Sequence, residues 1–183
     1  MRDELYSELV RIRRYRAEDI PLLFEAARES ISEEFGRWMP WCHPHYSLDD
    51  SSAFILSREA ACRNGEAYDF AVFDREDGAF LGGVGVNQLN REHGFANLGY
   101  WVRASARGRG VAAAAARLAA RFAFEDLGLN RIEIVIAAEN GNSQRAAQRA
   151  GAQREELLRS RLLIAGRLHD AVMYSLVAAD LNI

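Results

Sequence analysis

The sequence contains neither lysine nor threonine, and all 23 of its basic residues are arginine. No Schiff-base lysine is therefore available for pyridoxal phosphate, and no lysine is available for the phosphate-binding loop of the P-loop nucleotide hydrolases. A threonine nucleophile is excluded in the same way. The chemistry of this chain must come from other side chains or from the main chain.

Cysteine is scarce as well, with only Cys42 and Cys62 in the chain. Two cysteines are too few for a disulfide scaffold and lack the paired spacing of zinc sites, which suits a reducing compartment. The first residues are polar, without the apolar core of a signal peptide, and the longest alanine-rich run is interrupted by Arg117 and Arg121. We expect a cytoplasmic protein that is neither secreted nor embedded in a membrane.

An excess of positive charge is also absent, since the formal net charge is -3 and the isoelectric point is about 5.9. No global basic field exists to hold a nucleic-acid backbone, so we expect no nucleic-acid partner and only local anion binding. The 183 residues are 49% hydrophobic and 27% charged, which is typical of one globular domain. We therefore predict a single domain over residues 1–183, present as a monomer or a homodimer.

The spacing of apolar residues alternates between the period of strands and that of helices. Strands are predicted over residues 10–16, 68–73, 80–86, 96–102, 132–136, 156–164 and 168–178, and helices over residues 20–31, 47–64, 111–127 and 140–150. Residues 35–46 combine aromatic residues with two prolines, which predicts an irregular loop. A parallel crossover over residues 96–137 beside an antiparallel meander predicts an α+β fold, with one mixed, mostly antiparallel central sheet of about seven strands flanked by helices.

The strongest chemical signal is the segment Arg107-Gly108-Arg109-Gly110-Val111-Ala112, which stands where a strand ends and the longest helix begins. Glycines allow a ligand to approach the backbone, and the first N–H groups of a helix are unpaired donors at the positive end of its dipole. Arginines at 103, 107 and 109 add charge-assisted donors. A phosphate group is the ligand that this arrangement favours, whereas the plainer alternative is a glycine-rich connection with solvated arginines.

The same segment resembles the Gcn5-related N-acetyltransferase (GNAT) superfamily, whose signature Q/R-x-x-G-x-G/A is matched here by Arg107, Gly110 and Ala112. The resemblance implies the acetyltransferase fold and acetyl-coenzyme A (acetyl-CoA) as cosubstrate, with its pyrophosphate on this loop. It places the following residues at the cosubstrate: Trp101, Val102, Arg103, Arg107, Gly108, Arg109, Gly110, Val111, Ala112, Ala113, Asn140 and Ser143.

Further segments resemble one subgroup, the ribosomal-protein (serine/alanine) N-terminal acetyltransferases. They are Asn140-x-x-Ser143, residues 99–102 (Gly-Tyr-Trp-Val) and residues 38–41 (Trp-Met-Pro-Trp). The subgroup implies that Ser143 is the catalytic residue that protonates the departing thiolate, and that Asn140 binds the pantetheine amide. A helix-capping serine and a turn asparagine are the structural alternatives.

The sequence departs from the wider superfamily at two positions. Ala147 stands where many members carry a tyrosine that protonates the thiolate, and Ala152 follows Gly151 where a phenylalanine is usual. The first departure leaves Ser143 as the proton donor that the resemblance supplies. The second concerns packing and no chemical step.

The acceptor side is expected around Trp38, Glu34, Trp41, His45, Tyr100 and Trp101. The sequence nominates Glu33, Glu34, His43, His45 and Tyr100 as possible bases, with an ordered water ranked first because an α-ammonium of pKa about 8 loses its proton readily. The run Cys42-His43-Pro44-His45 has no second cluster at structural-zinc spacing, so no metal is expected.

The predicted function is direct transfer of acetyl from acetyl-CoA to a primary amine. Apolar residues on a connecting loop favour an acceptor that presents its amine beside an apolar group, such as a peptide or protein N-terminus. The alternatives are a small-molecule amine acetyltransferase, acting on a polyamine, a drug or a peptide antibiotic, and a non-catalytic acyl-CoA sensor.

Overall fold

Eight strands form one sheet in the order β1-β2-β3-β4-β5-β6-β8-β7. The computed structural model describes residues 1–183, apart from the side chains of residues 33 and 34. The strands are β1 Glu4–Tyr6, β2 Val10–Arg14, β3 Ala67–Asp74, β4 Phe80–Asn90, β5 Phe95–Val102, β6 Arg131–Ala137, β7 Gln153–Ile164 and β8 Arg167–Leu176. The helices are α1 Ile20–Ser30, α2 Glu33–Trp38, α3 Leu48–Arg63, α4 Val111–Glu125 and α5 Gly141–Arg149.

The sheet is mixed and mostly antiparallel, because only β5 and β6 run parallel. This confirms the predicted fold class, with eight strands in place of about seven. The additional strand is β1, which pairs with β2 from Glu4 opposite Arg13 to Tyr6 opposite Arg11. Three residues are too few to show a strand period in the sequence.

The prediction that residues 35–46 contain no regular element is wrong at their start. The six-residue helix α2 ends at Trp38, and Ser32 caps it by accepting a hydrogen bond from the Phe35 N–H at 3.2 Å. Pro40 follows two residues after the last helical residue, where it cannot extend the helix. A short capped helix therefore carries aromatic residues that the composition alone assigned to a loop.

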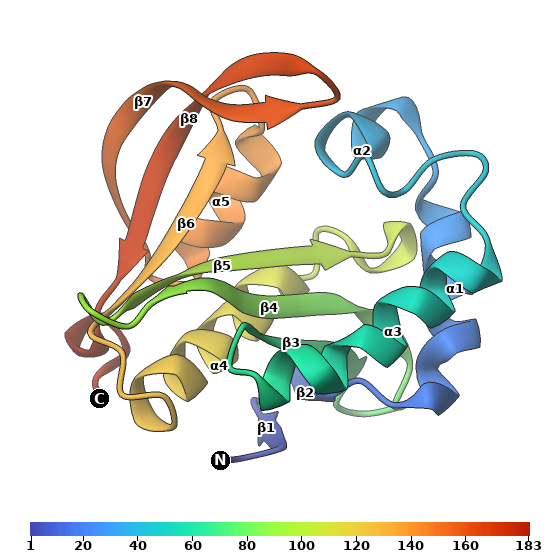
Figure 1. Ribbon diagram of the computed structural model, residues 1–183, viewed down its shortest axis with the longest axis horizontal. Helices are drawn as coiled ribbons and strands as arrows, with labels where there is room; N and C mark the ends of the chain where they lie inside the picture. Colours follow the sequence, from blue (N-terminus) through green and yellow to red (C-terminus); the bar gives the residue numbers. More distant parts are fainter.

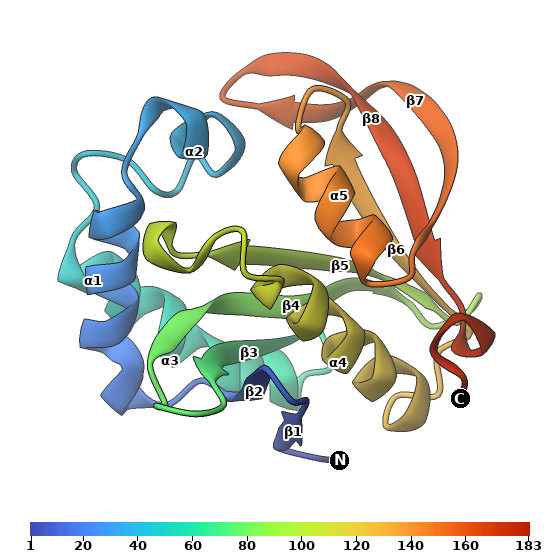
Figure 2. The same cartoon turned by 180° about the vertical axis from the view of Figure 1, so that it is seen from behind.

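The two faces of the sheet are covered by different helices, as Figures 1 and 2 show from opposite sides. On the α4 face, Phe122 packs edge-on against Phe70 of β3, with ring centroids 5.0 Å apart. On the other face, Ala71 and Phe73 of β3 share a core with Leu23 of α1. The alternation along β3 therefore directs neighbouring residues to two separate cores.

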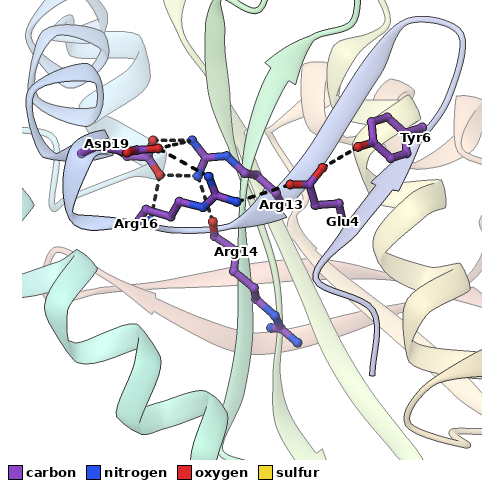
Figure 3. A network of polar contacts seen from close by, with 7 residues as sticks. Glu4, Tyr6, Arg13, Arg14, Arg16 and Asp19 are labelled. Atoms are coloured by element: carbon purple, nitrogen blue, oxygen red, sulfur yellow. Dashed lines mark hydrogen bonds and ion pairs between the residues drawn. The ribbon is translucent and has the colours of Figure 1, made fainter.

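A buried ion pair fixes the entry into α1. The two terminal guanidinium nitrogens of Arg13 each donate to one carboxylate oxygen of Asp19 at 2.7 Å, and Asp19 is fully buried (Figure 3). Asp19 also accepts a hydrogen bond from the Arg16 N–H at 2.8 Å. Because a buried charge needs a partner, this pair ties the start of α1 to strand β2.

The feature that positions the site is the divergence of β5 from β6. The two strands pair only from Phe95 opposite Arg131 to Asn97 opposite Glu133. Beyond that point β5 continues to Val102 and β6 to Ala137, and Figure 1 shows the two strands spreading apart toward α2. An unpaired strand edge is thereby created inside the sheet.

Candidate active site

A cavity of about 300 Å³ lies at this divergence. It is bounded by α2, the end of β5, the start of α4 and one face of α5. The lining residues are Phe35, Trp38, Met39, Tyr100, Trp101, Val102, Ala106, Arg107, Gly108, Gly110, Val111, Ala112, Ala113, Asn140, Asn142, Ser143, Arg145, Ala146 and Arg149. The cavity thus brings together most of the residues that the sequence places at acetyl-CoA.

The N-terminus of α4 supplies anion-binding donors to this cavity. Gly108 (φ 77°) and Gly110 (φ 85°) adopt left-handed backbone conformations that glycine favours. The first amide bonded within the helix is that of Ala114, which donates to the Gly110 carbonyl at 3.0 Å. The N–H groups of residues 111–113 therefore remain as donors at the positive end of the helix dipole.

The structure divides the arginines differently from the sequence prediction. Arg107 lines the cavity, but Arg103 is turned away and paired with Glu29, and Arg109 lies 3.0 Å from Asp74. Neighbouring carboxylates therefore hold the side chains of Arg103 and Arg109 outside the cavity lining.

Two arginines that the prediction missed line the cavity instead. They are Arg145 and Arg149 of α5. Their spacing of four residues places both on one face of a helix, and this was the signal available in the sequence. Arg107 precedes α4, and its guanidinium lies 4.6 Å from the ring centroid of Phe35, so arginines from two segments of the chain line the cavity.

The open edge of β5 provides main-chain donors. The Arg103 N–H donates to the Leu81 carbonyl at 2.9 Å, on the β4 side. Because alternate amides of a strand point to opposite sides, the N–H groups of Tyr100 and Val102 point to the edge that β6 has left. The N–H of Trp101 points toward β4, and its indole instead forms part of the cavity wall.

Ser143 and Tyr100 meet within the cavity. The Tyr100 hydroxyl donates to the Ser143 carbonyl at 2.9 Å, and the Ser143 hydroxyl donates to the Tyr100 oxygen at 3.2 Å. Burial raises the pKa of Tyr100 to about 12, so its hydroxyl is protonated at neutral pH. A protonated phenol beside the serine can hold the serine hydroxyl in place.

Asn140 caps α5, since its carboxamide oxygen accepts the Ser143 N–H at 3.1 Å. The capping role and the cavity position therefore coexist at this asparagine. Ala147, where a tyrosine is common in the superfamily, is fully buried in the main core and does not line the cavity. Ala152 is buried in the same core.

Aromatic side chains separate this cavity from a second one. Trp41 and Trp101 contact each other with ring centroids 5.2 Å apart, and Phe35 contacts both. The second cavity has a volume of about 230 Å³ and lies between α1, α3 and the segment that follows α2. Its lining residues are Leu23, Trp41, His43, Tyr46, Asp50, Phe54 and Trp101.

The remaining acceptor-side residues are spread over this region. Trp38 lines the first cavity and contacts His169 of β8, with ring centroids 5.9 Å apart. Trp41 lines the second cavity, whereas His45 is exposed and lines neither of the two cavities. The predicted contribution of Glu34 lies outside the described residues.

The cavity therefore combines anion-binding donors at a helix N-terminus with the open edge of a strand. Comparisons with known proteins agree with this arrangement. Residues 10–153 match the family described as the acetyltransferase (GNAT) domain. The chain is also 29% identical over 177 residues to a Bacillus subtilis (strain 168) protein provisionally named the ribosomal N-acetyltransferase YdaF, covering 95% of this chain and 94% of that protein.

Solved structures give the same result. A protein of Vibrio cholerae provisionally described as a ribosomal-protein-serine acetyltransferase is 30% identical, with a TM-score of 0.80 over 95% of this chain and 97% of that chain. The microcin C7 self-immunity acetyltransferase MccE, solved with acetyl-CoA and AMP, shares the fold at 22% identity, with a TM-score of 0.84 over 93% of each chain.

The chain belongs to the acetyltransferase (GNAT) family. It is an N-acetyltransferase, and acetyl-CoA is its acetyl donor. The helices in the described part of the chain include none that is both long and apolar enough to cross a membrane.

Proposed function

We propose that this enzyme acetylates the α-amino group of a peptide or protein N-terminus. The observation that carries the proposal is the aromatic, weakly charged acceptor region formed by the second cavity and the wall of Phe35, Trp41 and Trp101. A polyamine site would need clustered carboxylates, and among the side chains that the structure describes Asp50 is the one carboxylate that lines this cavity. The names of the bacterial relatives support the same acceptor class.

The donor half of the site fits acetyl-CoA. The N–H groups at the start of α4, together with Arg107, Arg145 and Arg149, would bind the pyrophosphate and the neighbouring phosphate. Asn140 would bind the pantetheine arm through the NH₂ group of its side chain, since its oxygen already caps α5. The bound donor supplies an acetyl thioester at the divergence of β5 and β6.

In the transfer step, the acceptor nitrogen forms a bond to the acetyl carbon and the carbon–sulfur bond breaks. The Val102 N–H, on the open edge of β5, would stabilise the negative charge that develops on the acetyl oxygen. Ser143 would give its proton to the departing sulfur and take one back from solvent. The hydroxyl of Tyr100 would hold Ser143 in place, and the acceptor nitrogen must lose one proton for the step to balance.

An α-amine suits this site better than a lysine side chain. Its pKa is about 8 against about 10.4 for lysine, so a larger fraction is neutral at pH 7. The second cavity would receive the side chain next to the amine, because its volume of about 230 Å³ and its aromatic lining accommodate a large apolar group. A small-molecule amine with an apolar substituent remains the competing acceptor.

The test is thiol release from acetyl-CoA with four acceptors, compared by kcat/KM. They are a peptide with a free N-terminus, an N-blocked peptide containing lysine, spermidine, and an aromatic amine. We expect the free N-terminus to give the highest kcat/KM. A preference of more than tenfold for spermidine would support a polyamine enzyme, and tight acetyl-CoA binding without turnover on any amine would support a sensor.

A further inference from the structure

A patch without side chains lies on the α1–α3 face of the sheet, beside the acceptor region. Gly85 of β4 pairs with Gly99 of β5, between the pairs Gly83–Trp101 and Asn87–Asn97. Gly99 is exposed, and among the atoms that the structure describes none lies within 4 Å of the position that a Cβ would take there. Gly85 and Gly99, which we call the glycine floor, therefore leave room for a group of the acceptor.

Asp69 of β3 borders this floor. A Cβ at Gly85 would lie 2.2 Å from its carboxylate oxygen Oδ1, so only glycine at position 85 allows the carboxylate to occupy this place. The other oxygen, Oδ2, accepts a hydrogen bond from Arg58 of α3 at 2.9 Å. One oxygen is thus anchored from the helix side while the other is directed over the glycine floor.

The position of Asp69 matches the face from which an amine must approach. Along β5, Tyr100 and Val102 pack against the α4 core and line the cavity for acetyl-CoA, whereas Trp101 packs against the α1–α3 core and lines both cavities. Gly99 lies two residues before Trp101 and therefore on the same face of the sheet. Neighbouring strands are about 4.8 Å apart, so a group above Gly99 lies about 5 Å from a carboxylate above Gly85. This distance is spanned by one water molecule or by an ammonium group held between them.

Arg58 also links Asp69 to the wall of the second cavity. The Arg58 guanidinium that anchors Asp69 also lies 4.7 Å from the ring centroid of Phe54, which lines that cavity. An acceptor whose apolar side chain enters the cavity would therefore carry its amine past Phe54 toward the glycine floor.

The bases nominated from the sequence fit less well. Tyr100 stays protonated at neutral pH, since burial raises its pKa to about 12. His43 lines the second cavity, where its ring lies against that of Tyr46, and His45 lines neither cavity. The side chains of Glu33 and Glu34 lie outside the described residues. Asp69, in contrast to His45 and Tyr100, carries a carboxylate, and that carboxylate faces the floor.

The electrostatic surroundings suit proton acceptance. Burial raises the pKa of Asp69 above its ordinary value, while Arg58 from α3 and Arg14 from β2 oppose that rise. The negative charge of Asp69 also acts on the phenol of Tyr15, which follows β2 and stays protonated because burial raises its pKa. A carboxylate with a raised pKa is a better base than an ordinary aspartate.

We propose that Asp69 is the residue that accepts the proton of the acceptor ammonium, directly or through one water, above the glycine floor of Gly85 and Gly99. The inference rests on the proposed function, because it assigns a role in the deprotonation of an amine acceptor. The proton passes from the acceptor nitrogen to the carboxylate and then to solvent, while the thiolate receives a separate proton.

The test compares the pH profiles of kcat/KM for the wild-type enzyme and Asp69→Asn, with a free N-terminal peptide as acceptor. In the wild type, the ammonium form reacts as long as Asp69 is ionised, so we expect a plateau that extends well below pH 8. In Asp69→Asn only the neutral amine reacts, so kcat/KM should fall about tenfold for each pH unit below the amine pKa of about 8. Parallel profiles for the two enzymes would overturn the proposal.

Two further variants separate catalysis from structure. Arg58→Gln removes the cation that opposes the rise in the Asp69 pKa, so we expect the lower end of the plateau to move to higher pH. Glu59→Gln removes a negative charge from the same helix, where Glu59 is exposed and paired with Arg63, and should leave the profile unchanged. If Asp69→Asn fails to fold, an unmoved plateau in Arg58→Gln would also contradict the proposal. Loss of turnover with every amine in the wild type would instead refute the proposed function.

Discussion

The hydroxyl oxygen of Tyr100 lies 2.9 Å from the carbonyl oxygen of Ser143 and 3.2 Å from the hydroxyl oxygen of the same residue. Two contacts from one phenol fix both the backbone and the side chain at the start of α5. The tyrosine comes from β5, so it orients the proposed proton donor from the opposite wall of the cavity. No local sequence pattern predicts this contact, because 43 residues separate the two positions.

We expect Tyr100→Phe to lower kcat while leaving the affinity for acetyl-CoA nearly unchanged. A single hydrogen bond contributes about 1 kcal/mol, which corresponds to a decrease in kcat of about fivefold. Steady-state kinetics and calorimetry measure the two quantities. A large loss of acetyl-CoA affinity with unchanged kcat would show that Tyr100 contributes to binding alone.

Ser143→Ala should lower kcat more strongly than it changes the KM for acetyl-CoA, because a leaving-group acid acts mainly in the transition state. General acid catalysis contributes about 10²- to 10⁴-fold, and the lower end is expected because a thiolate leaves more easily than an alkoxide. The measurement requires conditions in which chemistry limits the rate. A kcat within about twofold of the wild type would show that Ser143 has no catalytic role and only donates its N–H to the cap formed by Asn140.

Gly110→Val should abolish acetyl-CoA binding measured by calorimetry. Gly110 has φ 85° and precedes α4, so a β-branched side chain would strain the turn that presents the helix N–H groups. Gly78→Val is the matched control, since Gly78 also has a positive φ (74°) but lies in the β3–β4 turn, away from the cavity. Unchanged affinity in a folded Gly110→Val protein would contradict the pyrophosphate site.

Replacing Arg145 and Arg149 together by Gln should weaken acetyl-CoA binding and reduce its dependence on salt, because two phosphate-directed charges are lost. The expected loss is at least tenfold, on the basis of about 1.5–3 kcal/mol for a hydrogen bond to a charged group. Arg159→Gln, an exposed arginine of β7, is the control. Equal salt dependence of acetyl-CoA binding in the double variant and the control would show that neither arginine binds the phosphates.

Asp19→Ala should destabilise the fold by about 3–5 kcal/mol, because it leaves the buried guanidinium of Arg13 with only the longer contact of 3.8 Å to the exposed carboxylate of Glu18. Denaturant unfolding gives the free energy, and Glu18→Ala provides the comparison because Glu18 is exposed. If Asp19→Ala costs no more than Glu18→Ala, the pair does not stabilise the start of α1.

The sequence predicted those parts of the fold that depend on local periodicity and on glycine. Helix α4 and strands β3 to β6 follow from regular apolar spacing, and the α4 N-terminus follows from Gly108 and Gly110. Strand β1 and helix α2 were missed because each is too short to show a period.

The site was predicted less completely, because its remaining parts depend on tertiary contacts. The arginines at 103 and 109 stand in the right segment, but Glu29 and Asp74 hold them outside the cavity. Asp69 becomes a candidate only when β3, β4 and β5 are aligned and the glycines at 85 and 99 are seen to face each other. Pairing across strands is not encoded by the local pattern of one strand.

The most direct measurement uses one peptide that carries both a free N-terminus, with a large apolar first residue, and an internal lysine. After incubation with the enzyme and acetyl-CoA, mass spectrometry with peptide fragmentation locates the acetyl group. The account predicts acetylation of the α-amine at pH 7, with the lysine unmodified. Acetylation of the lysine, or of neither amine while spermidine is acetylated, would contradict it.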